Sequence, residues 1–387
     1  MKRGLIGKYL SVNLGGESFN AFLPDPLPPV PPIQIDGPLQ PLFERASLAL
    51  GRLDSASTLL PETSIFLYSY VRKEAVLSSQ IEGTQSSLSD LLLFEMEQVP
   101  GVPVVDAQEV SSYVSAMEHG LSRLRGGFPL SARLIREIHQ KLLEKGRGSE
   151  KDPGEFRLSQ NWIGGSRPGN AVFVPPPHTE VPQCISDLEK FMHTGSPSLP
   201  RIVQSGVLHV QFETIHPFLD GNGRVGRLLI TLFLCASGIL QEPLLYLSLY
   251  IKKHRNRYYE LLEVVRREGD WEAWLAFFLE GVAETAEGAV QTARRMVDLF
   301  EADRSRILKS GRQTASFLRV HDALKQRPLT TLSEATKRSG LSFPATASAM
   351  EFLVEMGLAR ELTGKKRNRV FVYTEYLSAL SEGTEPF

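Results

Sequence analysis

Apolar residues recur every three to four positions along most of this chain, which is the spacing of one face of an α-helix. Segments with this spacing are residues 39–60, 61–81, 87–96, 108–124, 131–145, 178–193, 200–215 and 272–309. Pro61 suits the first turn of the second helix, and Gly83 follows its end. Residues 223–238 are almost entirely apolar after Arg227, which predicts a helix buried on all sides. The pattern therefore predicts a mainly α fold.

Three short regions depart from the helical pattern. Residues 24–41 are rich in proline and should form an extended arm. Residues 161–164 and 171–174 are β-prone and flank a Ser-Arg-Pro-Gly-Asn turn, which predicts a β-hairpin. A lone hairpin in a helical body buries little surface, so we look for a functional reason for it. Residues 383–387, at the C-terminal end, should fray.

The length of 387 residues favours two or three domains. We divide the chain into an N-terminal helical region (1–107), a central core (108–300) and a C-terminal domain (301–387). No apolar run has the length of a membrane span, and the start lacks the apolar region of a signal peptide, so we expect a cytoplasmic protein with no membrane partner. Cys184 and Cys235 lie among apolar residues, which favours two buried thiols over a disulfide.

Residues 216–227, with the sequence His-Pro-Phe-Leu-Asp-Gly-Asn-Gly-Arg-Val-Gly-Arg, carry most of the chemistry of this chain. Gly221, Asn222 and Gly223 can adopt backbone angles that turn several N–H groups towards one anion. The helix that starts here adds the positive end of its dipole. The glycine spacing also fits a dinucleotide-binding pattern, but that pattern must follow a β-strand, and the preceding residues have helical spacing. We therefore predict a phosphate-binding loop of another kind.

The charged side chains of the same segment suit a metal-bound polyphosphate that is attacked by a hydroxyl. Asp220 offers a hard oxygen ligand for Mg²⁺. Arg224 and Arg227 project from nearly one face of the first helical turn, where a bound anion would relieve their conflict with the helix dipole. His216 lies beside them and can take a proton from the hydroxyl, because an unperturbed imidazole has a pKa of about 6.5.

This segment resembles the signature of the Fic (filamentation induced by cAMP) family, HPFx[D/E]GNGRxxR, at every fixed position. The resemblance implies a helical Fic core and the transfer of AMP from ATP to a Ser, Thr or Tyr hydroxyl of a protein, with pyrophosphate leaving. It puts the general base at His216 and the Mg²⁺ ligand at Asp220. The nucleotide-binding residues that it implies are Gly221, Asn222, Gly223, Arg224 and Arg227. Tyr259, beyond the core, is a candidate for the adenine site, with core packing as the alternative role.

The resemblance also suggests a role for the predicted hairpin. Fic proteins carry a flap that pairs with the backbone of the target protein as an added strand. The first arm of the flap would consist of Asn161, Trp162, Ile163 and Gly164. An ordinary surface hairpin remains the alternative interpretation.

Residues 78–83, Ser-Ser-Gln-Ile-Glu-Gly, resemble the inhibitory motif of Fic proteins, [S/T]xxxE[G/N]. Ser78, Glu82 and Gly83 occupy its fixed positions. Because the motif precedes the core, the chain is similar to the class with an N-terminal inhibitory helix. In that class the glutamate pairs with the last arginine of the signature, here Arg227, and so occupies the group that would bind the γ-phosphate.

The C-terminal region is basic although the net charge of the chain is −1: residues 304–373 hold 14 Lys and Arg against 5 Asp and Glu. Its predicted elements are three helices at 317–325, 332–339 and 344–356 and two strands at 358–361 and 369–373. This order resembles a winged helix-turn-helix domain, which makes DNA a candidate partner. The third helix has no Arg or Asn for base contacts, so protein binding or dimerisation stays an equal alternative.

Three functions remain open from the sequence. The first is protein AMPylation held back by Glu82, with another protein or the chain itself as the substrate. The second keeps the fold but removes AMP, or transfers another phosphate-containing group. The third is a nucleotide-sensing DNA-binding regulator, against which His216 counts, because a sensor needs no general base. The oligomeric state is also open, with a homodimer among the options.

Overall fold

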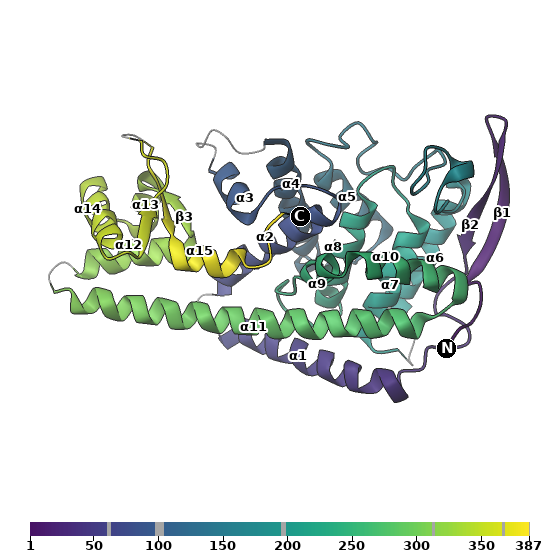
Figure 1. Cartoon of the computed structure of the whole chain (residues 1–387), viewed down its shortest axis with the longest axis horizontal. Helices are drawn as coiled ribbons and strands as arrows, with labels where there is room; N and C mark the ends of the chain where they lie inside the picture. The colour runs from purple at the N-terminus through teal and green to yellow at the C-terminus, as the bar shows by residue number, and fades with distance from the viewer. Residues whose placement is uncertain (60–62, 97–103, 195–198, 312–313, 366–367, 387) are drawn as a thin grey trace.

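The computed structural model describes residues 1–387 except 60–62, 97–103, 195–198, 312–313, 366–367 and 387. Figure 1 shows a helical body that is joined to a smaller C-terminal part by one long helix, α11 (Trp271–Lys309). Helices dominate the described residues, which confirms the predicted mainly α fold. None of the helices in the described ranges combines the length and the apolar composition that a membrane crossing needs.

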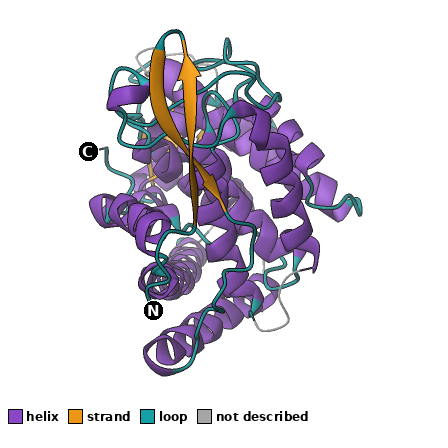
Figure 2. Ribbon diagram, turned by 90° about the vertical axis from the view of Figure 1, so that its right-hand side faces the viewer, coloured by secondary structure: helices purple, strands orange, loops and turns teal. Residues whose placement is uncertain are grey.

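The chain begins with a β-hairpin that the sequence analysis missed. Strands β1 (Gly7–Leu14) and β2 (Glu17–Pro24) pair antiparallel over their whole length, and the turn at Gly15 and Gly16 has positive φ at both residues. The hairpin projects from the edge of the helical body in Figure 1 and crosses in front of it in Figure 2. Residues 25–36, all of them described, contain no helix or strand, as expected of the proline-rich arm.

The helical body follows the predicted order, with ends that differ by a few residues. It opens with η1 (Gly37–Leu39), α1 (Gln40–Leu59) and α2 (Thr63–Ile81), and Pro61 lies outside the described residues. Its other helices are α3 (Leu88–Phe94), α4 (Val104–Arg125), α5 (Ala132–Leu142), η2 (Pro168–Asn170), η3 (His178–Glu180), α6 (Val181–Thr194), α7 (Arg201–Ile215), α8 (Asn222–Ala236), α9 (Ser248–Lys253) and α10 (Arg255–Glu268).

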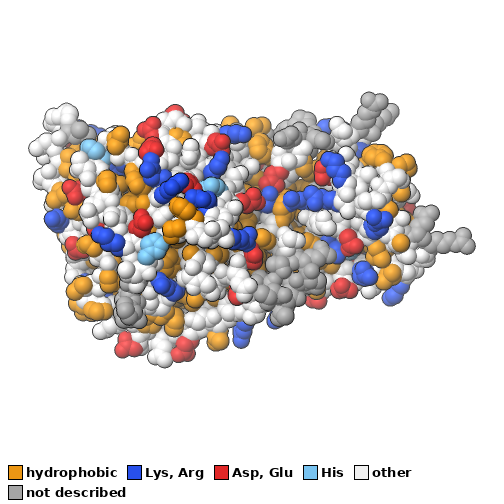
Figure 3. All heavy atoms as spheres, turned by 180° about the vertical axis from the view of Figure 1, so that it is seen from behind, with side chains coloured by type: hydrophobic (Ala, Val, Ile, Leu, Met, Phe, Trp, Pro, Cys, Tyr) orange, Lys and Arg blue, Asp and Glu red, His pale blue; other side chains and the backbone are white. Residues whose placement is uncertain are grey.

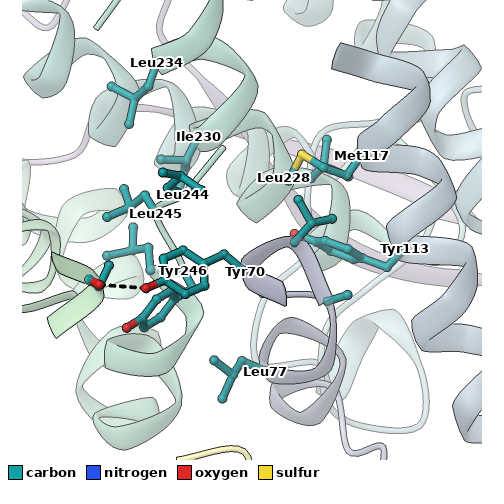
Figure 4. Close-up of a cluster of buried hydrophobic side chains, with 14 of the residues drawn as sticks. Tyr70, Leu77, Tyr113, Met117, Leu228, Ile230, Leu234, Leu244, Leu245 and Tyr246 are labelled. Carbon is teal, nitrogen blue, oxygen red and sulfur yellow. Dashed lines mark hydrogen bonds between the residues drawn. The ribbon is translucent and has the colours of Figure 1, made fainter. Parts of the chain in front are cut away.

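The core centres on α8, whose residues 224–234 are all buried, as its apolar sequence predicts. It packs against α2, α4, α5 and α7. Figure 4 shows buried side chains from α2, α4, α8 and the segment after α8: Leu77, Tyr113, Met117, Leu228, Ile230, Leu234, Leu244 and Leu245. Burying one such Leu or Ile side chain stabilises a fold by about 1.5–3 kcal/mol. Because this packing holds α8 from several sides, it also fixes the position of the helix N-terminus.

The predicted hairpin at residues 161–174 is smaller than expected. Its arms meet at one antiparallel bridge, in which Ile163 N donates to Phe173 O over 2.8 Å and Phe173 N donates back over 3.1 Å. Gly164 and Gly165 have φ near +70°, so the first arm leaves the extended conformation directly after Ile163. The second arm runs into the prolines of residues 175–177, which have no N–H to donate. The chain reverses here without building a ladder.

The C-terminal part contains every helix and strand that the sequence predicts for it and adds one strand and one helix. Its elements are α12 (Thr314–Gln326), β3 (Leu329–Thr331), α13 (Leu332–Ser339), α14 (Phe343–Glu355), β4 (Ala359–Glu361), β5 (Val370–Tyr373) and α15 (Thr374–Ser381). The three strands form one antiparallel sheet in the order β3-β5-β4. The predicted domain boundaries at residues 107 and 300 fall inside α4 and α11, and the division into three domains remains a prediction.

The prediction that residues 383–387 fray is wrong for the described residues, 383–386. Thr384 is buried, and its carbonyl oxygen accepts a hydrogen bond of 2.8 Å from Gln80 Nε2. Lys252 Nζ donates to Glu385 O and to Gln80 Oε1. These donors satisfy the tail backbone, so the segment lies against α2 and α9 instead of in solvent.

Both cysteines are free, as expected, and each is partly buried. Burial raises the pKa of the Cys184 and Cys235 thiols to about 12, so both stay protonated near neutral pH.

Candidate active site

The loop between α7 and α8 is closed by one buried amide side chain. His216 ends α7 in the left-handed conformation, with φ 50° and ψ 60°. Asn222, which is 2% exposed, accepts from Phe218 N through Oδ1 and donates to Phe218 O through Nδ2, both over 2.9 Å. The side chain of Asn222 is therefore committed to the loop, and its backbone N–H is the group that remains for an anion.

Two further side chains support the loop, and the sequence analysis identified neither of them. The buried Arg157 donates from Nε to His216 O over 2.9 Å. His139 of α5 stacks on Phe218 with ring centroids 3.7 Å apart, accepts from Gly154 N at Nδ1 and meets Asp220 O over 3.0 Å at Nε2. Burial lowers the pKa of His139 to about 4, so the ring is neutral and Nε2–H is the donor to that carbonyl.

His216 has the protonation state of a general base. Its Nδ1 lies 3.4 Å from Glu213 O, which can only accept, so Nδ1 carries the hydrogen and Nε2 keeps its lone pair. Burial, followed by the charge of the Arg157 guanidinium, lowers the pKa of His216 to about 4. The imidazole is therefore neutral at pH 7.

Asp220 is the acidic group of the loop. Its Oδ1 accepts from Gly221 N over 2.5 Å and from Arg224 Nη2 over 3.4 Å, and the side chain remains partly exposed. Within the described residues, no group of three or more His, Cys, Asp or Glu side chains could hold a metal ion. One carboxylate is enough for Mg²⁺ when phosphate oxygens and water supply the other ligands. The donor set therefore fits a cation that arrives together with a phosphorylated substrate.

Arg224, in the first turn of α8, forms an ion pair with a residue that the sequence did not point to. Its Nη1 lies 2.7 Å from Glu109 Oε1 of α4, and both side chains are almost fully buried. Burial raises the pKa of Glu109, and the Arg224 charge offsets part of that effect. Nε of Arg224 has no hydrogen-bond acceptor among the described residues, so it is a donor that a phosphate would satisfy.

Arg227, one turn further along α8, meets the end of α2. Its Nη2 lies 2.6 Å from Glu82 Oε1, its Nε donates to Ser78 Oγ over 2.9 Å, and Nη2 also donates to Ser78 O. Burial opposes ionisation of Glu82, but the Arg227 guanidinium outweighs it and lowers the pKa of the carboxyl group. The structure thus brings together the three side chains that the sequence analysis associated with inhibition.

Two glycines allow this contact. A Cβ on Gly223 would lie 2.3 Å from Glu82 Oε1, so only glycine lets the carboxylate approach the N-terminus of α8 this closely. Gly83 follows Glu82 with φ +104°, a conformation that other residues rarely adopt. Both glycines therefore belong to the geometry of the Glu82–Arg227 pair.

Comparison with known proteins assigns the family. The Fic/DOC family N-terminal model matches residues 40–122, and the Fic/DOC family model matches residues 129–234. The chain belongs to the Fic family. The first match contains Glu82, and the second contains the whole loop from His216 to Arg227.

Curated relatives of this Fic protein are identical to it at 27–29% of the aligned positions. Protein adenylyltransferase Fic of Aedes aegypti is 29% identical over 259 residues, which cover 64% of this chain and 47% of that protein. The protein of the same name from Drosophila persimilis is 27% identical over 258 residues, with the same coverage. The chain thus spans about half the length of these relatives.

Solved structures share the fold of this Fic protein. A Fic family protein from Desulfovibrio desulfuricans aligns with a TM-score of 0.55 at 20% identity, covering 88% of this chain and 98% of that one. A Fic domain containing signaling protein from Bacteroides thetaiotaomicron aligns with a TM-score of 0.51 at 17% identity, covering 65% and 95%. These likenesses support the predicted Fic fold.

Tyr259, the candidate for the adenine site of this Fic protein, and its neighbour Tyr258 lie in different environments. Tyr258 is buried, and its hydroxyl lies 2.9 Å from His209 Nε2, which is a packing role. Tyr259 is 42% exposed. Burial, followed by the negative charge of Glu82, raises the pKa of Tyr259. Tyr259 therefore remains the candidate for the adenine site.

One of the candidate flap residues contacts the loop between α7 and α8, and two others are exposed to solvent. Asn161 Nδ2 donates to Phe218 O over 3.0 Å, so this side chain supports the loop between α7 and α8. Trp162 and Gly164 are exposed, and Ile163 forms the single bridge of the hairpin. The flap is therefore tied to the loop at its base and open to solvent beyond it.

Proposed function

We propose that this Fic protein transfers AMP from ATP to a Ser, Thr or Tyr hydroxyl of a protein, and that Glu82 holds the resting enzyme inactive. The observation that carries the proposal is the neutral His216 imidazole, with Nε2 unprotonated, in the loop that leads to the N-terminus of α8. The name protein adenylyltransferase, borne by relatives that match 64% of the chain, supports the same reaction.

The reaction makes one bond to the α-phosphorus and breaks another, and one proton moves from the hydroxyl to His216. The hydroxyl oxygen of the target attacks the α-phosphorus of ATP, and His216 Nε2 accepts the hydroxyl proton. The bond between the α-phosphorus and the oxygen bridging to the β-phosphate breaks, and pyrophosphate leaves with the electron pair. A base that is neutral at pH 7 is suited to this role, because the proton acceptor is available without prior deprotonation.

The N-terminus of α8 is our candidate for holding the phosphates. Its first N–H groups have no acceptor within the helix, and the helix dipole adds positive charge there. Arg224 would support the β-phosphate through its unsatisfied Nε–H group, and Arg227 would support the γ-phosphate. Mg²⁺ at Asp220 would neutralise phosphate charge. This assignment gives a role to Asp220 and to both arginines of α8.

The proposed brake is competition for one guanidinium. Arg227 cannot present its fork of N–H groups to Glu82 and to a γ-phosphate at the same time. Glu82 Oε1 also lies against Gly223, where it adds negative charge beside the proposed phosphate site. Phosphoryl transfer requires in-line geometry, so a triphosphate displaced from Arg227 would be held away from attack.

The exposed part of the flap is the proposed docking site for the target. A short segment of the target would add to residues 161–164 as a strand through backbone hydrogen bonds, which would fix its hydroxyl without strong selection on sequence. Trp162 is the exposed aromatic anchor of this segment.

A second candidate function concerns the basic C-terminal part, which we propose to be a winged-helix module. The excess of Lys and Arg in residues 304–373 favours an anionic partner such as DNA. On the face seen in Figure 3, basic and acidic side chains alternate over this part, at the right, without forming one basic stripe. That distribution favours weak, salt-sensitive binding. Loss of a DNA mobility shift on deletion of residues 304–387, without nucleotide turnover by any variant, would instead favour a DNA-binding regulator.

The deciding experiment is mass spectrometry of the Glu82→Gly protein after incubation with ATP and Mg²⁺. We expect an added AMP on the protein, and we expect Glu82→Gly with His216→Ala to show none. An unmodified Glu82→Gly protein, together with release of AMP from a previously modified protein by the wild type, would instead identify removal of AMP as the reaction.

A further inference from the structure

A cavity of about 330 Å³ lies between α2, α9, α11 and the chain end, and it shares no lining residue with the candidate active site. Its volume lies within the range of sites for small molecules. The side chains that give it its chemical character are Lys73, Tyr246, Tyr250, Lys253, Arg295 and Glu382.

Lys73 is the unusual member of this lining. The residue is 2% exposed, and its Nζ lies 4.8 Å from the centre of the Tyr246 ring. This ammonium group forms no hydrogen bond or ion pair with any residue that the structure describes. A buried charge without a partner is costly, so the group must either lose its proton or find a counter-ion.

The carboxylates around the cavity leave Lys73 without a close partner. Glu382 pairs with Arg295, and both side chains of that pair are mostly exposed to solvent. Glu284 lines the cavity from an exposed position on α11. Burial lowers the pKa of Lys73 to about 8; the charges of Glu382 and Glu385 oppose this shift, and those of Arg295 and Lys253 add to it. A lysine with this pKa is still mostly charged at pH 7.

We propose that this cavity binds a small ligand that carries a phosphate group. The phosphate oxygens would accept from Lys73 inside the cavity and from Arg295 and Lys253 at its mouth, giving the buried ammonium the counter-ion that it lacks. Since Arg295 is also the partner of Glu382, the ligand would replace an exposed ion pair that is worth little.

The aromatic walls would receive the remainder of the ligand. Tyr246 is buried and packs edge-to-face on Tyr70 with ring centroids 5.3 Å apart, and Figure 4 shows the two rings side by side. Tyr250 is held by a hydrogen bond of 2.9 Å from its hydroxyl to Glu280. Two fixed rings favour a phosphate ester with a flat or apolar group over free phosphate.

The test uses thermal unfolding and titration calorimetry with two probes, inorganic phosphate and phenyl phosphate. We expect both to raise the Tm of the wild-type chain, and phenyl phosphate to bind more tightly. Equal affinities of the two probes would identify free phosphate as the ligand, because the aromatic walls would then contribute nothing. If neither probe binds at millimolar concentration, the proposal is wrong.

Lys73→Met is the deciding variant, because methionine fills the space of lysine without its charge. We expect it to raise the Tm in the absence of phosphate and to weaken the wild-type phosphate response at least tenfold. Lys190→Met, at an exposed lysine on α6, is the matched control and should keep the full response. Because any phosphate bound at the active site is common to all these proteins, it cancels in the comparison.

Arg295→Gln, at an exposed position, provides a second variant should Lys73→Met fail to fold. It should weaken binding of both probes while leaving the Tm without ligand nearly unchanged. Equal responses of the wild type, Lys73→Met and Arg295→Gln would overturn the proposal. The readouts are binding and unfolding, so the result does not depend on which reaction the active site catalyses.

Discussion

Arg224 and Arg227 lie one helical turn apart on α8, and each forms an ion pair with a carboxylate from an earlier part of the chain. The two pairs differ in kind. Glu82 follows the last residue of α2, directly before Gly83, and its side chain is 34% exposed. Glu109 lies in α4, with helix on both sides, and its side chain is 4% exposed.

The difference indicates which pair can open. A carboxylate at a helix end can leave by rotation of its own side chain, because little packing depends on its position. A carboxylate within a buried helix can move only with that helix, and removing one partner of a buried pair costs about 3–5 kcal/mol. We therefore regard Glu82–Arg227 as the switch and Glu109–Arg224 as the fixed support of the phosphate site.

The largest expected effect comes from opening the switch. Glu82→Gly should raise self-modification about tenfold to a hundredfold, because Arg227 loses a charge-assisted bond worth about 1.5–3 kcal/mol and becomes available to the γ-phosphate. Label transfer from radiolabelled ATP measures the effect, with Glu82→Gly and His216→Ala combined as the inactive control. Equal transfer by the wild type and Glu82→Gly would count against the switch.

The second prediction concerns the support. Glu109→Gln removes the counter-charge of the buried Arg224, so it should lower the free energy of unfolding by about 3 kcal/mol. It should not activate the enzyme. Combined with Glu82→Gly, it should reduce transfer below that of Glu82→Gly alone. Denaturant unfolding and the label-transfer assay measure these effects. Glu82→Gln is the matched control, with a smaller loss of stability. An active, equally stable Glu109→Gln protein would remove the distinction between the pairs.

A smaller effect is expected from the C-terminal tail, which contacts the switch helix two residues before Glu82. Gln80→Ala removes the hydrogen bond from Nε2 to Thr384 O and the one that Oε1 accepts from Lys252. Each is worth about 0.5–1.5 kcal/mol, so basal transfer should rise a few-fold and remain below that of Glu82→Gly. Deleting residues 383–387 should act in the same direction, and unchanged transfer by both proteins would show that the tail does not hold the switch.

The smallest effect is expected from pH. The pKa of His216 lies near 4, below the ordinary value, so the neutral base persists as pH falls and is lost only when pH approaches that value. The kcat/KM of Glu82→Gly should therefore be flat from pH 8 to about 5.5. The wild type should stay inhibited over the same range, because the pKa of Glu82 is also lowered and its ion pair survives mild acid. Half-loss of kcat/KM near pH 6.5 would contradict the assignment of His216.

Local spacing in the amino-acid chain was enough to predict the order of most of the helices, the chain reversal near Ile163 and the candidate phosphate-binding segment from His216 to Arg227. Each of these features is local. A helical period, a group of turn residues and the segment from His216 to Arg227 are each contained in a short stretch of the chain. The dependence of Arg227 on Glu82 came from the family resemblance, and their ion pair spans 145 residues.

Tertiary packing alone decided the partners that have no local pattern. Nothing in the sequence around Glu109 marks it as a partner of Arg224, because the two meet only when α4 packs beside α8. His139 likewise contacts the Asp220 carbonyl oxygen, 81 residues further along the chain. The tail was expected to fray because its own residues form no element, yet donors on α2 and α9 satisfy its backbone. Such contacts depend on which surfaces the whole chain buries, and no window of neighbouring residues contains that information.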